Sequence, residues 1–186
     1  MCKKERILVV AAIVVAFAVV MFCPLIATAG GNEIPPAWNQ KLNASKRFDV
    51  VLDGEAVLDK ETGLVWERSP STTYQTWRIA LWECNVLKKG HRMGWRLPTV
   101  QELTSLVDPT VMKPSLPVGH PFSFSSTTYP GSLYPFEFWT ANTEVESADR
   151  AWVVVFVDYG QVTVQTKSSG YGMWCVRSGQ GSVDVQ

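Results

Sequence analysis

The sequence predicts an α+β domain in which two helices pack on a small antiparallel sheet. Three observations lead to this prediction. Strand-like runs of β-branched and aromatic residues lie at both ends of the region 47–180. Two segments with the apolar spacing of helices lie between these runs. Eight Trp, eight Phe and five Tyr supply enough large side chains to fill a core. We therefore expect one domain in the 186-residue chain.

The charge balance narrows the range of functions. The chain has 17 Lys and Arg residues against 17 Asp and Glu residues, and 46% of its residues are apolar. This composition is typical neither of a disordered chain nor of a strongly basic nucleic-acid-binding domain. Nucleic acid is therefore not an expected partner.

The first 29 residues have the layout of a secretory signal peptide. The basic segment MCKKER precedes an uninterrupted apolar run at 7–22, and the small residues Ala27-Thr28-Ala29 predict cleavage after Ala29. The alternative is an uncleaved membrane anchor, although the apolar run is shorter than about 18 residues. Lipidation of Cys23 is not expected because the bulky Phe22 precedes it. We expect an extracytoplasmic protein that is periplasmic, cell-surface or secreted, and that contacts a membrane only through this segment if it is not cleaved.

Cleavage would leave Cys84 and Cys175 as the remaining cysteines and a net charge of about −2. Two cysteines in an oxidising compartment most simply predict one disulfide. The alternative is a metal site or a catalytic thiol. No short Cys–Cys or His–His spacing accompanies His91 and His120, so no metal and no cofactor is expected.

The segments that flank the expected domain are polar and rich in glycine or proline. A flexible leader is predicted at 30–46 and a disordered tail at 181–186. The domain itself is expected to begin near Arg47 with a β-hairpin or meander at 47–68, because Asp53-Gly54 lies between two apolar runs.

Two helices are expected after this meander. The first has one apolar face, made by Trp77, Ala80, Leu81, Cys84 and Leu87. Lys88 and Lys89 in its last turn, followed by Gly90, predict its C-terminal end. The second helix begins with Thr99 and Glu102, which have the spacing of a capping box.

A long loop and four strands complete the predicted fold. Prolines and aromatic residues are frequent in 108–137, which indicates an ordered loop held by its rings. The strand-like runs follow at 138–143, 151–157, 161–165 and 172–177, and Cys175 lies in the last of them.

Five motifs in this order resemble the Lcl C-terminal domain family of bacteria. They are GEAVLDKETGLVWER (54–68), GWRLPTVQEL (94–103), FWTAN (138–142), AWVVVFVDYGQV (151–162) and MWCVRSG (173–179). The resemblance covers about residues 47–179. It implies a C-type-lectin-like fold in which a disulfide ties the first helix to the last strand. It also implies a secreted or cell-surface domain that binds a polysaccharide or a surface protein.

The expected fold is a compact form that lacks the long calcium-binding loop of sugar-binding C-type lectins. The interval 144–150 contains Glu144, Glu146 and Asp149, but no E-P-N or Q-P-D signature. Ca²⁺ requires six to eight oxygen ligands, and three carboxylates supply part of such a shell. We therefore expect ligand binding to be independent of calcium.

The candidate ligand-binding residues are Lys88, Lys89, Arg92 and Arg96. Together with His91 they place four fixed positive charges within nine residues, a pattern that favours anionic or sulfated polymers. The alternative is that Lys88 and Lys89 complement the end of the first helix. Arg96 in the WRLP segment is expected to bond a carbonyl or carboxylate within the domain.

The aromatic residues allow two interpretations. The rings of Phe122, Phe124, Tyr129, Tyr134 and Phe136 either stack on sugars or pack the long loop against the core. Five tryptophans beside apolar runs are expected mainly in the core, namely Trp66, Trp95, Trp139, Trp152 and Trp174.

Catalysis is not expected. Formylglycine-generating enzymes, which use a related fold, need a reactive cysteine pair, whereas the two cysteines here are expected to form a structural bridge. The sequence has no G-x-S-x-G motif of a serine hydrolase. The other alternative to a binding domain is a structural subunit of a surface or pilus-like assembly.

Overall fold

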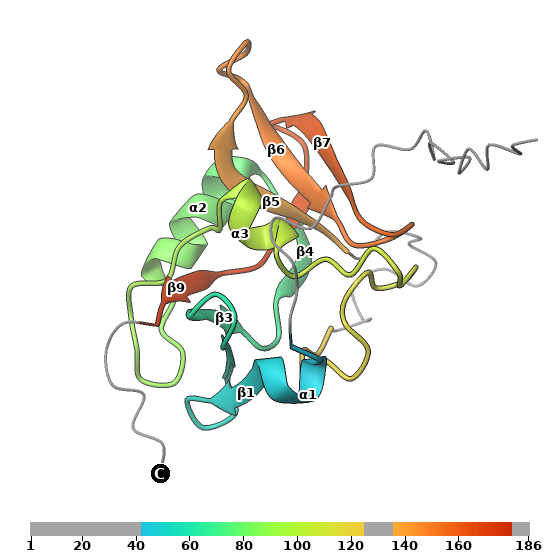
Figure 1. The fold of residues 1–186 in the computed structure, drawn as a ribbon. Coiled ribbons are helices and arrows are strands. Elements are labelled where there is room, and N and C mark those ends of the chain that lie inside the picture. Colours follow the sequence, from blue (N-terminus) through green and yellow to red (C-terminus); the bar gives the residue numbers. More distant parts are fainter. Residues whose placement is uncertain (1–41, 125–135, 180–186) are drawn as a thin grey trace, which may run out of the picture. The chain divides into compact units, whose positions relative to one another are not determined.

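The structure is a computed structural model that describes residues 42–124 and 136–179. The expected signal peptide at 1–29, residues 30–41 of the expected leader, and the expected tail at 181–186 lie outside the described residues. The domain is mixed α+β, with two sheets and three short helices in its described part (Figure 1).

The first sheet is the meander expected at 47–68, extended by a strand from the C-terminal end of the domain. Its order is β1-β2-β3-β9 and every pair is antiparallel. The strands are β1 (Phe48–Val51), β2 (Ala56–Asp59), β3 (Leu64–Glu67) and β9 (Val176–Ser178). The turn between β1 and β2 contains Asp53 and Gly54, both with left-handed backbone angles, as the sequence indicates.

The second sheet has the order β4-β8-β5-β6-β7. Its strands are β4 (Ser71–Gln75), β8 (Tyr171–Met173), β5 (Glu137–Thr143), β6 (Arg150–Val155) and β7 (Gln161–Thr166). The expectation of one small antiparallel sheet is wrong in two respects. There are two sheets, and β5 runs parallel to β8 with Phe138 opposite Gly172.

The predicted strand at 172–177 is divided between the two sheets. Trp174 and Cys175 lie between β8 and β9, and both are fully buried. The chain crosses from one sheet to the other at these two residues. The sequence predicts a continuous strand because Trp174 and Val176 favour strands and no turn residue separates them, whereas the pairing partners of the two halves lie on different sheets.

The ordered fold begins before Arg47. Helix α1 (Ala44–Arg47) is capped by the Asn43 side chain, which accepts a hydrogen bond from the Lys46 backbone N–H. Ala44 and Arg47 are buried. The end of the expected flexible leader is therefore part of the domain. A helix of four residues leaves no apolar period in the sequence, so periodicity did not predict it.

Helix α2 (Trp77–Val86) has the predicted buried face, with Ala80 and Cys84 fully buried. It ends at Val86 and not at the lysines, because Leu87 leaves the helical conformation. The prediction that Lys88 and Lys89 lie in its last turn is therefore wrong.

Helix α3 (Val100–Thr104) has the predicted capping box. The Thr99 hydroxyl accepts from the Glu102 backbone N–H at 3.2 Å, and the Glu102 carboxylate accepts from the Thr99 N–H at 2.8 Å. Both bonds supply partners for donors at the helix N-terminus.

The core is built around Trp174. Edge-to-face contacts join its ring to Trp66, Phe122 and Phe124, with centroid distances of 5.7, 4.8 and 5.5 Å. Phe122 and Phe124 belong to the predicted long loop, so the described part of that loop packs its rings inward. Tyr129 and Tyr134 lie outside the described residues.

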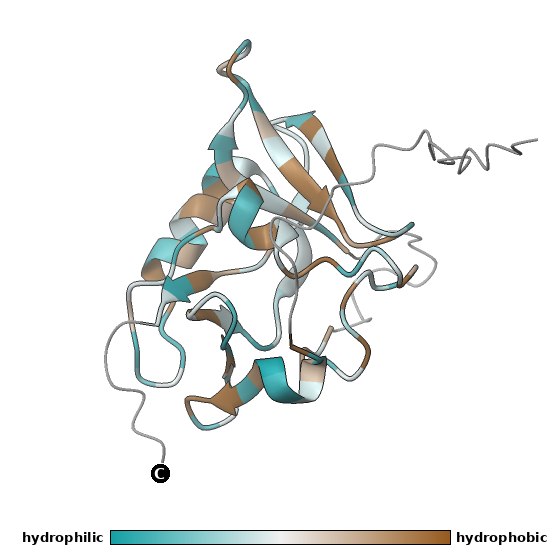
Figure 2. Cartoon of the chain, in the orientation of Figure 1, coloured by the Kyte–Doolittle hydropathy of each residue, from teal (hydrophilic) through white to brown (hydrophobic). Residues whose placement is uncertain are grey.

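Four of the five tryptophans expected in the core are buried. They are Trp66, Trp95, Trp139 and Trp174, while Trp152 is half-buried. The hydropathy colouring in Figure 2 shows strongly hydrophobic segments along β6 and β7.

Candidate functional site

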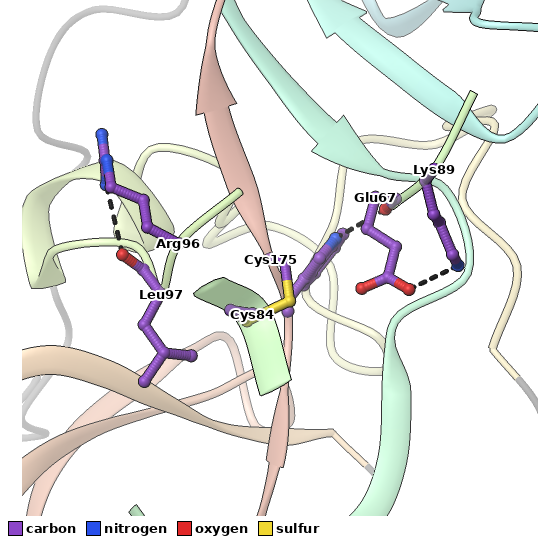
Figure 3. The surroundings of a disulfide bond; sticks show 7 residues. Glu67, Cys84, Lys89, Arg96, Leu97 and Cys175 are labelled. Atoms are coloured by element: carbon purple, nitrogen blue, oxygen red, sulfur yellow. Dashed lines mark hydrogen bonds and ion pairs between the residues drawn. A yellow bond between two sulfur atoms is a disulfide. The ribbon is translucent and has the colours of Figure 1, made fainter. Parts of the chain in front are cut away.

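A disulfide joins Cys84 of α2 to Cys175, across 91 positions of sequence (Figure 3). Both cysteines are fully buried. The bridge attaches α2 to the segment in which the chain crosses between the two sheets. This part of the expected framework is confirmed.

Lys89, one of the four candidate cations, is bound to a residue that packs beside the disulfide. Its Nζ lies 2.5 Å from Glu67 Oε1 (Figure 3), and the Glu67 side chain is only 6% exposed. The Glu67 backbone N–H donates to the Cys175 carbonyl at 3.0 Å, and Trp174 Nε1 donates to the Glu67 carbonyl at 2.8 Å. Lys89 is therefore held against the core and neutralises a nearly buried carboxylate.

Burial raises the pKa of Glu67, and the hydrogen bond and charge of Lys89 only partly oppose this. The pKa of Glu67 is higher in the folded chain than its ordinary value of 4.5. The stabilising contribution of the protonated Glu67 carboxyl is therefore fully present below pH 4.5. It is lost as the pH rises through the folded pKa. We expect wild type to lose stability relative to Glu67→Gln as the pH rises above 4.5.

Urea denaturation at several pH values measures this difference in the free energy of unfolding. Lys89→Gln should enlarge the total decline and extend it to higher pH, because it removes the cation that lowers the Glu67 pKa. A difference between wild type and Glu67→Gln that is constant with pH would contradict the assignment.

Arg96 is also held within the domain. Its two terminal nitrogens lie 2.6 and 2.8 Å from the two Glu102 oxygens, and it donates to the Leu97 carbonyl at 3.2 Å. Burial alone would raise the Glu102 pKa, but the bonds from Arg96 and Thr99 outweigh it and lower the pKa. The expectation that Arg96 bonds a carbonyl or a carboxylate of the domain is confirmed, and its guanidinium is engaged.

Lys88 and Arg92 differ from the other two cations. Both are exposed, and neither side chain forms a hydrogen bond or ion pair with any residue in 42–124 or 136–179. They lie in a turn closed by two backbone hydrogen bonds between Lys89 and Arg92, of 2.9 and 3.1 Å. The Trp95 indole N–H donates to the Arg92 carbonyl at 3.1 Å. We call residues 88–92 the cationic turn.

The surroundings of the cationic turn are of mixed charge. An open pocket of about 540 Å³ is lined by Asp53, Glu55, Lys88, Gly90, His91 and Met93. The Gly90 N–H donates to the Glu55 carboxylate, which fixes the turn against the β1–β2 loop. Lys88 therefore lies near two carboxylates, whereas Arg92 is not part of the pocket lining. The uniform patch of four cations expected from the sequence is reduced to two available side chains.

The acidic interval 144–150 is engaged in local contacts. Glu144 forms an ion pair with Arg150 at 3.3 Å, and the Ser147 hydroxyl bonds Asp149 at 2.5 Å. Within the described ranges, no group of three or more His, Cys, Asp or Glu side chains is placed to hold a metal ion. In the same ranges, no helix has both the length and the hydropathy needed to cross a membrane.

A second exposed feature lies on the outer side of α2 and was not anticipated. Ile79, Trp82 and Val86 are 42%, 63% and 48% exposed. Their spacing of three and four residues places them on one face, opposite Cys84. We call these three residues the outer ridge. The sequence does contain the pattern of the outer ridge, because α2 has two apolar stripes. The stripe that contains Cys84 was sufficient to explain how the helix is buried, so the second stripe was not considered.

The profile of the Lcl C-terminal domain family matches residues 55–177, which is well over half of the chain. The matched region contains α2, the cationic turn, α3, both cysteines and all strands from β2 to β8. Comparison with curated proteins found no match. The order of motifs around the disulfide and the family profile agree, and the chain belongs to the Lcl C-terminal domain family.

Proposed function

We propose that the chain is an extracytoplasmic bacterial binding domain that holds an anionic polysaccharide through Lys88 and Arg92. The observation that carries the proposal is the state of these two side chains. They are exposed on a turn whose backbone is fixed by internal hydrogen bonds, while the neighbouring Lys89 and Arg96 neutralise carboxylates of the domain.

The chemistry of the two cations fits sulfate or carboxylate groups. The guanidinium of Arg92 offers two parallel N–H donors to such a group, and Lys88 adds a compact charge four positions earlier. A turn that is already ordered loses little conformational entropy when a ligand binds. Each exposed charge pair contributes on the order of 1 kcal/mol or less, so useful affinity requires several contacts.

The proposal includes a compact, calcium-independent, C-type-lectin-like fold. Its support is the bridge between the helix α2 and the C-terminal strand segment, together with the short interval 144–150, whose Glu144 is paired with Arg150. The extracytoplasmic location is supported by the layout of residues 1–29 and by the disulfide, since such bonds persist in oxidising compartments.

A structural subunit of a surface assembly is the second candidate, and the outer ridge is the observation that favours it. An enzyme of the formylglycine-generating type is disfavoured, because its chemistry requires a reactive cysteine pair. The cysteines of the described residues are bridged and buried.

The combined variant Lys88→Ala/Arg92→Ala should elute from a heparin column at a lower salt concentration than wild type. Loss of two contacts with sulfate or carboxylate groups reduces both the affinity and its salt dependence, because fewer counterions are released. Chromatography of the exported protein over a salt gradient measures the shift.

The matched control is Lys46→Ala/Lys60→Ala, which removes the same net charge. Lys46 lies in α1 and Lys60 follows β2 at the end opposite Glu55, so this variant should elute with wild type if the cationic turn is the site. Elution of both variants at the same reduced salt concentration would show a general charge effect and reject the turn. Retention abolished by a calcium chelator would reject calcium independence.

A further inference from the structure

The outer ridge is an apolar surface on an otherwise well-packed helix. Most of the large side chains of the described residues are buried, yet Trp82 exposes 63% of its surface in the middle of α2. The disulfide holds the opposite face of the helix against the core, so rotation of α2 cannot bury the ridge. Figure 1 shows α2 at the margin of the described fold, and Figure 2 shows strongly hydrophobic and hydrophilic bands alternating along it.

The spacing of the ridge is that of a coiled-coil seam. Ile79, Trp82 and Val86 occupy consecutive a, d and a positions of a heptad. In the same register Arg78 is a g position and Glu83 is an e position. Arg78 is exposed and Glu83 half-buried, and neither forms a hydrogen bond or ion pair elsewhere in the described part of the chain.

The signs of these two flanking charges select an orientation. In a parallel helix pair the g position of one helix faces the following e position of the other, so Arg78 meets Glu83 of the second copy twice. In an antiparallel pair equivalent flanks meet each other, and Glu83 would face the second copy's Glu83. Opposite charges favour the first arrangement and like charges disfavour the second.

We propose that α2 pairs in parallel with α2 of a second copy of this chain, with the outer ridge as the shared seam. A seam of ten helical residues is short. It falls below the roughly 1,200 Å² of total buried surface that is typical of stable interfaces, so the pair is transient and depends on concentration.

The parallel arrangement has a consequence for ligand binding, which rests on the function proposed above. The cationic turn begins two residues after the end of α2. Two parallel helices therefore bring the Lys88 and Arg92 side chains of both copies to the same end of the pair. A polymer that spans both turns gains avidity without any new type of contact. An extended anionic polysaccharide is a ligand of this kind.

Sedimentation velocity of the exported protein over a range of concentrations tests the pairing. Arg78→Glu and Glu83→Arg should each weaken dimerisation several-fold, and the double variant Arg78→Glu/Glu83→Arg should restore it, because the opposite charges again face each other. Trp82→Ser should weaken dimerisation by about tenfold or more, since it removes the central apolar side chain. A monomer at all concentrations, or a dimer unaffected by Trp82→Ser, would overturn the proposal.

The orientation is tested by cross-linking. Val86→Cys should form a disulfide-linked dimer under mild oxidation, because identical a positions meet in a parallel pair. Lys46→Cys, in α1, is the matched control and should remain monomeric. Cross-linking of a mixture of Ile79→Cys and Val86→Cys only as the 79–86 heterodimer would indicate an antiparallel pair and overturn the parallel arrangement.

Heparin chromatography separates this inference from the proposed function. If both are correct, Trp82→Ser elutes earlier than wild type but later than Lys88→Ala/Arg92→Ala. If wild type dimerises as described and does not bind heparin-like polymers, the pairing stands and the proposed ligand is wrong. If Trp82→Ser is monomeric and elutes with wild type, the coupling between pairing and binding is overturned.

Discussion

Replacement of Cys84 by Ser is expected to lower the free energy of unfolding by about 2–5 kcal/mol. The bridge closes a separation of 91 residues, so its loss greatly enlarges the unfolded ensemble. It also releases α2 from the crossover between β8 and β9, and it leaves a serine hydroxyl at a position with no exposed surface. Urea denaturation of wild type and variant, followed by tryptophan fluorescence, measures the difference.

Cys175→Ser and the variant with both cysteines replaced by Ser should be measured in the same way. All three proteins lose the same covalent bond, so the double variant should be much less destabilised than the sum of the two single variants. Wild type treated with a reductant strong enough to open the bridge should approach the same stability. A loss below about 1 kcal/mol in all three would contradict the structural role of the bridge.

Replacement of Trp174 by Ala is expected to cost about 3–5 kcal/mol, because it leaves a cavity where six aromatic side chains meet. Besides the rings of Trp66, Phe122 and Phe124, it contacts Phe138 and Phe156, with centroid distances of 5.3 and 5.5 Å. Its indole N–H satisfies the buried Glu67 carbonyl. Thermal and urea unfolding measure the loss.

Trp82→Ala is the matched control, because it removes the same side chain from a position that is 63% exposed. Measured at a concentration where the protein is monomeric, it should change stability by less than about 0.5 kcal/mol. Trp174→Phe should lie between the two, since it keeps most of the packing and removes the donor to Glu67. Equal losses in Trp174→Ala and Trp82→Ala would contradict the central position of Trp174.

Several features of this protein were predictable from the sequence because their signals are local. The Asp53-Gly54 turn, the Thr99–Glu102 capping box and the apolar face of α2 each depend on residues within one or two turns of chain. The family resemblance was found in the same way, because short motifs stand in a particular order. The disulfide was predictable by a different route, since the expected export of the chain leaves a single pair of cysteines.

The candidate site was predicted only in part. The four cations were found from their positions in the sequence, but two of them, Lys89 and Arg96, are paired with carboxylates of the domain. Glu67, which pairs with Lys89, lies on β3 and is 22 positions distant. The sequence does not show which cation pairs with Glu67, because any of the four cations would neutralise a nearby carboxylate equally well. The outer ridge was missed for the opposite reason, since its spacing is local but its exposure depends on which face the disulfide holds inward.

Sequence alone determined where α2, α3 and most of the strands lie and how several of them begin, because capping, turn and periodic signals act between near neighbours. It also determined which two cysteines are joined, because the expected export of the chain leaves one pair. Tertiary structure decided how these elements are combined. It divided 172–177 between two sheets, added β4 from the polar run Ser71–Gln75, and left Lys88 and Arg92 as the available cations of the candidate site. The physical reason is that the pairing of β8 and β9, the burial of Trp174 and the Lys89–Glu67 ion pair are each completed by a partner far away in the sequence, and the partner is chosen only when the chain packs.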